Sequence, residues 1–158
     1  MKKSIKLLLV LLLSTITVWI VYQKKGAQTI NTDEQITEVV IYKNPGCLCC
    51  DKWADHLEEN GFKITSIKEH DDMIAFKESK NIPLDKSSCH TAVIEGYSVE
   101  GHVPASDIKR LLQKGTEGVG LTAPGMPAKA PGMDLPSSDT YDVLFIDSKG
   151  ETTLFATH

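Results

Sequence analysis

The sequence predicts an α/β domain in which strands and helices follow the order β-α-β-α-β-β-α, with an added hairpin at the C-terminus. Two observations predict this class. Short apolar runs rich in β-branched residues alternate with segments whose apolar residues recur every three or four positions. Turn-forming Pro, Gly and Asn residues separate these segments. About 120 residues follow the N-terminal region, which is enough for one domain.

The first predicted strand is Val39–Tyr42, an apolar run that is typical of a buried strand. Asn44-Pro45-Gly46 ends it, because Pro fixes φ and Gly permits a tight turn. A helix is predicted from about Cys50, since Trp53, Ala54 and Leu57 recur at helical spacing. Asn60-Gly61 provides its C-terminal cap.

A second strand is predicted at Phe62–Ile67, where apolar and polar residues alternate. The segment Asp71–Lys80 is predicted to be a helix with Met73, Ile74 and Phe76 on its inward face. The third strand is Thr91–Ile94. The turn Glu95-Gly96 joins it to a fourth strand, Tyr97–Glu100.

The last predicted helix opens at Pro104–Asp107 and carries Ile108, Leu111 and Leu112 on one face. Gly115 and Gly118 stop it. The segment Val119–Ser138 follows, and its repeated Pro-Gly-Met cannot form a helix or a central strand. The strands Tyr141–Ile146 and Glu151–Phe155, joined by a turn, form the closing hairpin.

This order of elements is the thioredoxin or glutaredoxin arrangement, in which a redox turn follows the first strand. The loop before the third strand faces that turn, so Cys89 and His90 are expected to meet the cysteines of Cys47–Cys50. Proteins of this fold usually place a cis-proline in that loop. Here a thiol takes its place, which weakens a general disulfide-exchange function and favours a metal site of four thiols.

The N-terminus is predicted to be a signal or membrane-anchor segment, residues 1–25. Lys2, Lys3 and Lys6 precede an apolar run from Leu7 to Tyr22, and two lysines follow it. The run is short for a membrane span, but no clear cleavage site is present, so we expect an uncleaved anchor in the inner membrane rather than a cleaved signal. Residues 26–38 form a linker, and residues 39–158 form the exported, periplasmic domain.

The exported part of the chain is acidic. Five of the 17 basic residues lie in the first 25, which hold no acidic residue, so 12 basic and 21 acidic residues remain and the net charge is −9. A field of this sign disfavours nucleic acid as a partner and favours cations.

Three of the four cysteines lie in Cys47-Leu48-Cys49-Cys50, between a strand and the start of a helix. The free N–H groups and the dipole of a helix N-terminus stabilise a thiolate. These thiols can exchange electrons, hold a metal ion, or both. An oxidoreductase would use Cys47 as nucleophile and Cys50 as resolving thiol. The same pattern is compatible with a structural disulfide, with buried cysteines that carry no chemistry, and with a zinc-stabilised interaction module.

Several motifs resemble the CopG-like family of bacterial copper-binding proteins, a domain long described as of unknown function. They are Tyr-x-x-x-Gly-Cys-x-Cys-Cys-x-x-Trp at 42–53, Ser-Cys-His-Thr-Ala at 88–92, Glu-Gly-His-Val-Pro-Ala at 100–105, and the paired Pro-Gly-Met. The resemblance covers about Val39–Phe155. It implies a thioredoxin-like fold, an extracytoplasmic setting, copper binding and a link to copper resistance. It also places Cys47, Cys49, Cys50 and Cys89 on the family's four metal-binding cysteines.

Four thiolates suit Cu(I), a soft ion that prefers sulfur. Zinc is the rival, although its usual paired Cys-x₂₋₄-Cys knuckles are missing. Possible secondary ligands are His90, His102, Met126 and Met133. Trp53 is expected in the core or as a lid over the cysteines, whereas His56, Lys43 and Lys52 are expected to be solvated. The partners we expect are copper ions and other exported copper-handling proteins.

Overall fold

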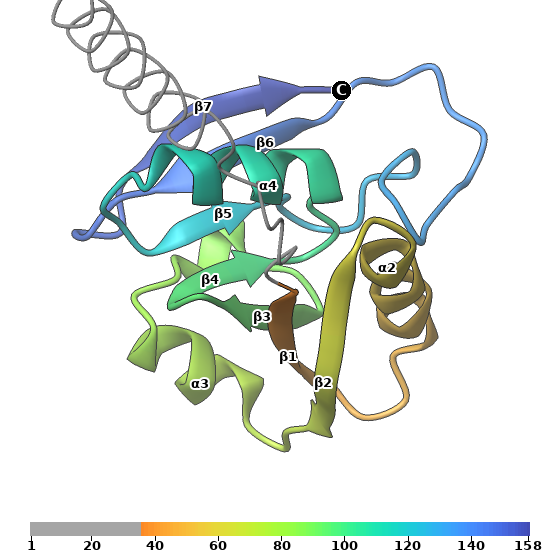
Figure 1. Ribbon diagram of the computed structural model, residues 1–158, viewed down its shortest axis with the longest axis horizontal. Helices are drawn as coiled ribbons and strands as arrows, with labels where there is room; N and C mark the ends of the chain where they lie inside the picture. The colour runs from red at the N-terminus through yellow and green to blue at the C-terminus, as the bar shows by residue number, and fades with distance from the viewer. Residues whose placement is uncertain (1–35) are drawn as a thin grey trace, which may run out of the picture. The chain divides into compact units, whose positions relative to one another are not determined.

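A seven-stranded mixed sheet lies at the centre of the molecule, with the strand order β2-β1-β3-β4-β5-β6-β7 (Figure 1). The structure is a computed structural model that describes residues 36–158. The elements in chain order are β1 Thr37–Lys43, α2 Leu48–Glu59, β2 Phe62–Glu69, α3 Met73–Ser79, the 3₁₀ turn η1 Leu84–Lys86, β3 His90–Ile94, β4 Tyr97–Glu100, α4 Ala105–Lys114, β5 Gly120–Thr122, β6 Asp142–Ile146 and β7 Thr152–Thr157. The mixed α/β class predicted from the sequence is confirmed.

The strand pairings determine which loops meet. β1 runs parallel to β2 and antiparallel to β3, and the register pairs Lys43 with His90. The C-terminal end of β1 therefore lies beside the N-terminal end of β3. β1 leads into the segment 44–50, which carries three cysteines and is called the cysteine turn below. β4 pairs antiparallel with β3 and parallel with β5, and the hairpin β6–β7 extends the sheet beyond β5.

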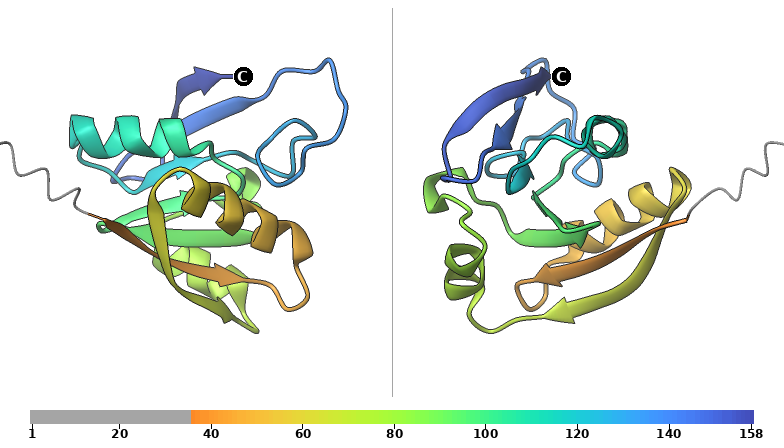
Figure 2. Two further views of the ribbon diagram at one scale, coloured as in Figure 1. Left: turned by 45° about the vertical axis from the view of Figure 1, so that its right-hand side comes forward. Right: turned by 60° about the vertical axis from the view of Figure 1, so that its left-hand side comes forward.

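The two faces of the sheet are covered by different helices (Figure 2). A hydrophobic core cluster joins α2 and α4 to one face of the sheet. Fully buried side chains of the two helices pack there with side chains of the strands: Trp53, Leu57, Ile108 and Leu111 with Val39, Ile41, Ala92, Ile94, Val99 and Leu121. Because side chains alternate along a strand, Thr91 and Glu100 point to the opposite face. Lys77 of α3 bonds to both, so α3 covers that second face.

Helix α3 buries a different set of residues from the one predicted. Met73 is 4% exposed and lies inward as expected, but Ile74 is 62% exposed and Phe76 is only partly buried. Lys77, one turn after Met73, is buried in their place. The helix turns its i, i+4 positions to the sheet, and a charged residue occupies one of them because Glu100 provides a buried partner.

Strand β5 was not predicted. Gly120–Thr122 lies inside the segment assigned to the irregular tail, yet all three residues are buried between β4 and β6. Three residues are too few to show a periodic pattern, so the strand is defined by its neighbours. The Pro-Gly-Met repeat that follows is free of helix and strand, as expected.

Two boundaries also differ from the prediction. Helix α2 begins at Leu48, about half a turn earlier than expected, and β1 includes Thr37 and Glu38 from the predicted linker. The predicted anchor and the rest of the linker lie outside the described residues. Within residues 36–158, no helix combines the length and the apolar character needed to cross a bilayer.

Candidate metal centre

The cysteine turn lies at the N-terminus of α2. Cys47 is the N-cap residue, with extended backbone angles and no capping bond from its side chain, and Cys49 and Cys50 belong to the first helical turn. The first backbone N–H groups of a helix have no partner within the helix and carry partial positive charge. The local sequence therefore places three sulfur atoms where negative charge is stabilised.

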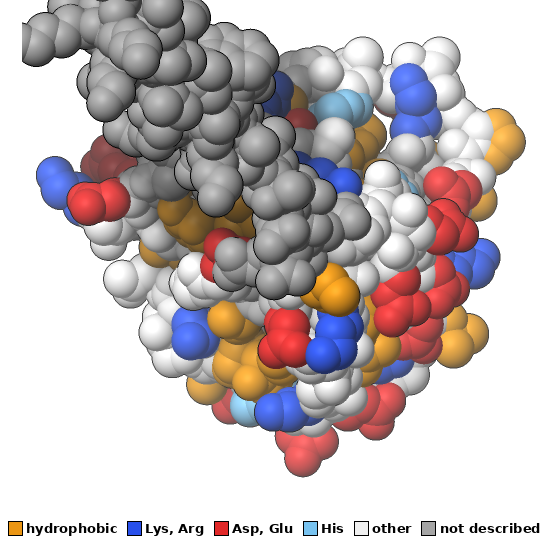
Figure 3. Space-filling view, viewed as in Figure 1, with side chains coloured by type: hydrophobic (Ala, Val, Ile, Leu, Met, Phe, Trp, Pro, Cys, Tyr) orange, Lys and Arg blue, Asp and Glu red, His pale blue; other side chains and the backbone are white. Residues whose placement is uncertain are grey.

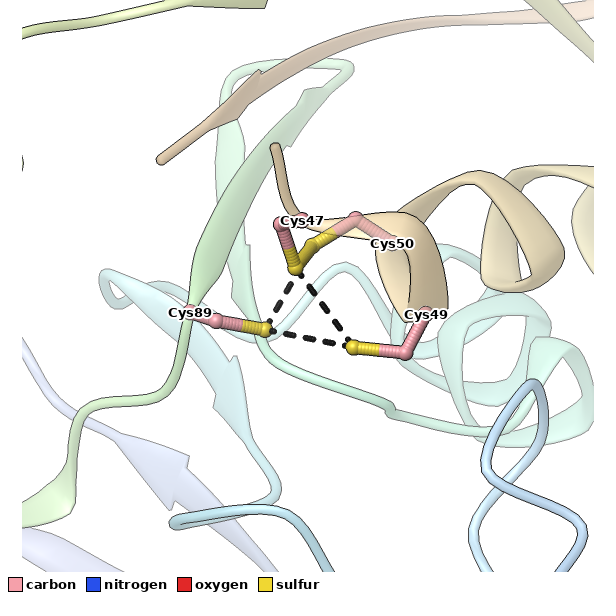
Figure 4. Close-up of side chains that lie close together, drawn as sticks. All are labelled: Cys47, Cys49, Cys50 and Cys89. Atoms are coloured by element: carbon pink, nitrogen blue, oxygen red, sulfur yellow. Dashed lines mark hydrogen bonds between the residues drawn. A yellow bond between two sulfur atoms is a disulfide. The ribbon is translucent and has the colours of Figure 1, made fainter. Parts of the chain in front are cut away.

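Cys89 joins these three from the loop between η1 and β3. The backbone N–H of Asn44, in the cysteine turn, donates to the carbonyl oxygen of Cys89 at 3.3 Å. The Cys89 Sγ lies 3.4 Å from the Cys50 Sγ and 4.0 Å from the Cys49 Sγ, and the Cys47 and Cys49 Sγ atoms are 3.5 Å apart (Figure 4). All four sulfur atoms lie within 4.8 Å of one another.

Cys47 and Cys50 form a disulfide, while Cys49 and Cys89 are free thiols. The sequence left this pairing open. Burial, followed by the nearby Cys49, raises the pKa of Cys89 to about 11. The Cys89 thiol therefore keeps its proton near neutral pH unless a cation displaces it. Reduction by two electrons and two protons would turn the site into a set of four thiols.

Lys43 lies beside the cysteine turn and is buried, contrary to the prediction that it is solvated. Its Nζ donates to the Asp51 Oδ1 at 2.7 Å and to the carbonyl oxygen of Cys47 at 3.3 Å. The ammonium is buried because a carboxylate of α2 and a carbonyl of the turn replace its water. Lys52, by contrast, is exposed as expected.

His90 and His102 both contact Cys89, and both are fully buried. The Cys89 Sγ is 3.8 Å from the His90 Nδ1 and 3.9 Å from the His102 Nε2. Burial lowers the pKa of His90 well below its usual value and also lowers that of His102, so both imidazoles are neutral near pH 7. A neutral imidazole keeps one nitrogen lone pair for a metal ion.

The Pro-Gly-Met loop packs against this site. The carbonyl oxygen of Pro131 accepts a hydrogen bond from the His102 Nδ1 at 2.8 Å. Gly132 has φ +81°, and a Cβ there would lie 2.7 Å from the backbone nitrogen of Trp53, so only glycine fits. Met126 is 58% exposed, and Met133 is partly buried. Their role as copper ligands stays a prediction.

Trp53 is a core residue, as expected. It is fully buried, its Nε1 donates to the carbonyl oxygen of Val103 at 2.9 Å, and its ring lies 4.5 Å from the ring of His90. Because this hydrogen bond fixes the indole, Trp53 gives His90 a rigid surface to pack against.

A buried polar network centred on Glu100, which reaches the residue before Cys89, was not predicted from the sequence. The Glu100 carboxylate accepts hydrogen bonds from Lys77 Nζ, from the backbone N–H of Ser88 at 2.6 Å, and from Thr91 Oγ1 at 2.5 Å. Burial raises the pKa of Glu100, and Lys77 opposes that rise. The spacing of Lys77 from Met73 was the available signal, since it puts a charge on the inward face of α3. Through the Ser88 N–H, this network fixes the backbone next to Cys89.

His56 is also placed differently from the prediction. It is half-buried rather than solvated, and its Nε2 accepts a hydrogen bond from the backbone N–H of Ala105 at 3.1 Å. Burial lowers its pKa, against the opposing charges of Glu59 and Asp134. His56 therefore caps α4 and joins the two helices of one face, away from the cysteines.

Acidic side chains gather over α2 on the face shown in Figure 3. Asp51, Asp55 and Glu58 follow one another at helical spacing and line a shallow pocket of about 360 Å³ against the edge strand β2. A surface of this sign attracts cations toward the helix that carries the cysteines.

Comparison with known proteins adds to this geometry. A family described as a protein of unknown function, DUF411, matches residues 86–133, the stretch that contains Cys89, His90 and His102. No curated protein matches the chain. Two solved structures do match, entitled copper resistance protein copG, form 1 and form 2. Both are 39% identical to this chain.

The first of these structures has a TM-score of 0.71, and the match covers 77% of this chain and 96% of that one. For the second the TM-score is 0.73 and the shares are 78% and 98%. The chain belongs to the CopG family. Membership in the CopG family, together with the cysteine cluster, indicates a copper-related function, and the family resemblance inferred from the sequence is confirmed.

Proposed function

We propose that this CopG-family chain binds copper through Cys47, Cys49, Cys50 and Cys89 and takes part in copper resistance. One observation carries the proposal, namely that the four sulfur atoms lie within 4.8 Å of one another although Cys89 is 39 residues from Cys50. Copper resistance is what the titles of the matching structures state for those proteins. Reduction of the Cys47–Cys50 disulfide makes all four thiolates available.

The oxidation state that suits these ligands is Cu(I), because soft thiolates prefer a soft ion. Cys49 and Cys50 are adjacent, so they do not easily close one small tetrahedral site together. Thiolates at this spacing suit bridging between several Cu(I) ions, which also relieves their mutual repulsion. Zinc is the less favoured metal, since a structural zinc site uses four well-separated ligands.

The setting we propose is extracytoplasmic, with a tether formed by residues 7–22 in the inner membrane. The basic N-terminus and the apolar run support it. Copper ions are the cargo, and other exported copper-handling proteins are the proposed donors or acceptors. Cu(I) prefers thiolate ligands, whereas Cu(II) accepts imidazole ligands more readily. His90 and His102 therefore support a role in shifting copper between oxidation states.

Metal analysis of the full chain, reduced and loaded anaerobically with Cu(I), tests the proposal. Several copper ions per chain are expected. One zinc ion with no affinity for copper would support a zinc module instead, and no metal at all would overturn metal binding.

The variant Cys89→Ser gives the first specific prediction. It should reduce the copper stoichiometry of the reduced protein, because it removes the ligand that closes the cluster from the β3 side. The fold should persist, since Cys89 is only partly buried. Circular dichroism controls for folding, and an unchanged copper content would exclude Cys89 from the site.

A second candidate function is thiol–disulfide exchange, which the Cys47–Cys50 disulfide at a helix N-terminus favours. In that reaction the Cys47 thiolate attacks a substrate disulfide and releases one substrate thiolate. Cys50 then displaces the second, so the substrate gains two electrons and the Cys47–Cys50 pair loses them. Cys49 and Cys89 have no part in this chemistry.

The two candidates differ in what they require of Cys49. For a copper cluster, Cys49→Ser should lower copper binding about as much as Cys47→Ser, and insulin reduction should be weak in all forms. Copper stoichiometry measures the first property, and the rate of insulin reduction measures the second. Full copper loading in Cys49→Ser, combined with vigorous reductase activity that Cys47→Ser abolishes, would decide for the oxidoreductase.

A further inference from the structure

The disulfide leaves a second set of metal donors intact. With Cys47 and Cys50 joined, the four-thiolate set has lost two ligands. The Cys89 thiol still faces His90 and His102, and one ligand atom from each of these three residues lies within 4.8 Å of the others. Both histidines are fully buried. The oxidised protein therefore keeps one sulfur and two nitrogen donors around one point.

The orientation of His102 is fixed by its hydrogen bond. Its Nδ1 lies 2.8 Å from the carbonyl oxygen of Pro131, and a carbonyl only accepts, so Nδ1 carries the proton. The lone pair of the neutral ring is then on Nε2, the atom that faces the Cys89 Sγ at 3.9 Å. A backbone carbonyl that holds the far nitrogen is the usual support of a metal-binding histidine.

His90 has an unused ring nitrogen. Its Nε2 is buried and has no hydrogen-bond partner among the described residues, and its Nδ1 meets only the Cys89 Sγ at 3.8 Å. With the His90 proton on Nε2, the His90 Nδ1 and the His102 Nε2 both turn a lone pair toward the Cys89 sulfur, and the single S–H proton can serve only one of them. A metal ion in place of that proton would lie within reach of the sulfur and of both rings.

We propose that Cys89, His90 and His102 form a second metal site, which holds one copper ion while Cys47 and Cys50 are joined as a disulfide. Binding forms one metal–sulfur bond, releases the Cys89 proton to solvent and transfers no electron. For Cu(II), a set of two imidazoles and one thiolate is more suitable than a set of four thiolates. The Cys49 Sγ, 4.0 Å from the Cys89 Sγ, is the nearest further donor. The choice of copper rests on the proposed function, whereas the donor set does not.

Cys89 belongs to both sets, so the redox state of the Cys47–Cys50 pair selects the coordination. In the reduced protein, the Cys89 sulfur is available to bridge metal ions together with Cys47, Cys49 and Cys50. In the oxidised protein the Cys89 sulfur faces the two histidines at 3.8 and 3.9 Å, with the free Cys49 thiol at 4.0 Å. One chain would then present a sulfur-rich site and a nitrogen-rich site that share a ligand.

The test uses the full chain in its disulfide form, checked by alkylation of two free thiols per chain. Titration with Co²⁺ alone avoids copper redox chemistry, and sulfur-to-cobalt charge-transfer absorption reports a bound thiolate. One ion per chain is expected. His102→Gln and Cys89→Ser should weaken binding by about 100-fold or more, beyond the roughly 10- to 100-fold that loss of an outer-shell partner costs. The matched control His56→Gln, at a histidine that lies away from the cysteines, should change it less than about tenfold. Similar affinities in wild type and His102→Gln, or no bound ion, would overturn the site.

X-ray absorption of the wild-type oxidised protein keeps the test independent of how the variants fold. Imidazole scattering around the bound ion is expected, and a purely sulfur shell would overturn the inference. Anaerobic Cu(I) loading of the reduced protein separates this inference from the proposed function. If the reduced chain takes up several copper ions and the oxidised chain none, only the second site fails. If the reduced chain takes up none, the four-cysteine proposal fails.

Discussion

Two lysines near the cysteine site are paired with carboxylates. Lys43 Nζ contacts Asp51, and the buried Lys77 contacts Glu100, so each cation is balanced by a carboxylate. Several thiolates within 4.8 Å would repel one another strongly at this partly buried position. No further lysine or arginine side chain bonds to the four cysteines in the described part of the chain. Charge balance of the reduced site therefore falls to protons, such as the one that Cys89 keeps near neutral pH, or to bound cations that displace them.

His56 makes a pH prediction at the residue scale. Its pKa is lowered from 6.5, so between that value and the lower folded pKa the unfolded chain binds more protons than the folded one. The free energy of unfolding should therefore fall as pH drops below about 6.5. Protonation removes the acceptor for the Ala105 N–H. Because His56 is only half-buried, its share should stay below the limit of about 1.4 kcal/mol per pH unit.

Urea unfolding of the metal-free protein at several pH values between about 7.5 and about 5.5, on either side of the ordinary histidine pKa, measures this effect. The variant His56→Gln keeps a side-chain acceptor that does not titrate, so its stability should depend less on pH than that of the wild type. Parallel pH profiles for the two proteins would show that His56 is not responsible.

At the scale of elements, three segments hold the Ser87–Cys89 loop in place. Glu100 of β4 accepts from the Ser88 N–H, and α3 supplies Lys77 to the same carboxylate. Residues beyond β5 contribute as well, since Gly125 donates its N–H to the Ser87 carbonyl and accepts from the Ser88 hydroxyl. Gly101 allows the close approach, because a Cβ there would lie 2.6 Å from the Cβ of Ser88. The position of Cys89 is thus a product of three elements.

Glu100→Gln should destabilise the protein strongly, because it leaves the Lys77 ammonium buried without its partner. Removing one member of a buried ion pair costs about 3–5 kcal/mol of unfolding free energy. The double variant Lys77→Met with Glu100→Gln removes both charges and should recover part of that loss. Urea unfolding of the three proteins measures it, and a loss below about 1 kcal/mol in Glu100→Gln would mean that the pair does not stabilise the fold.

At the scale of the molecule, residues 36–158 form a compact unit that carries the whole site. The sheet brings the end of β1 and the start of β3 side by side, and α2 and α4 close the core above one face. The hairpin β6–β7 extends the sheet on the far side of β5, and the chain from β5 to β6 includes the loop that bonds His102. Chain segments from both halves of the domain thus complete the candidate metal centre.

The N-terminal segment gives a prediction for the whole protein. If residues 7–22 remain attached, the protein should sediment with membranes and resist carbonate extraction, because an apolar segment of that kind partitions into the bilayer. Cell fractionation and N-terminal sequencing check this. A soluble product that begins near Gly26 or Ala27 would identify the segment as a cleaved signal.

Local sequence was enough to predict most of the elements and the cysteine turn. A strand, a Pro-Gly turn and a helix start depend on neighbouring residues, so Cys47, Cys49 and Cys50 could be placed at a helix N-terminus without a structure. The order of elements also predicted that Cys89 would meet them. This held because antiparallel pairing of β1 with β3 brings the two loops together.

Tertiary structure alone decided the burial and the partners of the polar residues. Lys43, Lys77 and His56 lost water because a carboxylate or a backbone group on another element replaced it. Strand β5 exists because β4 and β6 hydrogen-bond to it. The hydrogen bond from His102 to Pro131 likewise depends on where separate segments end in space. The sequence thus determined which donors the site contains, and packing decided how they face one another.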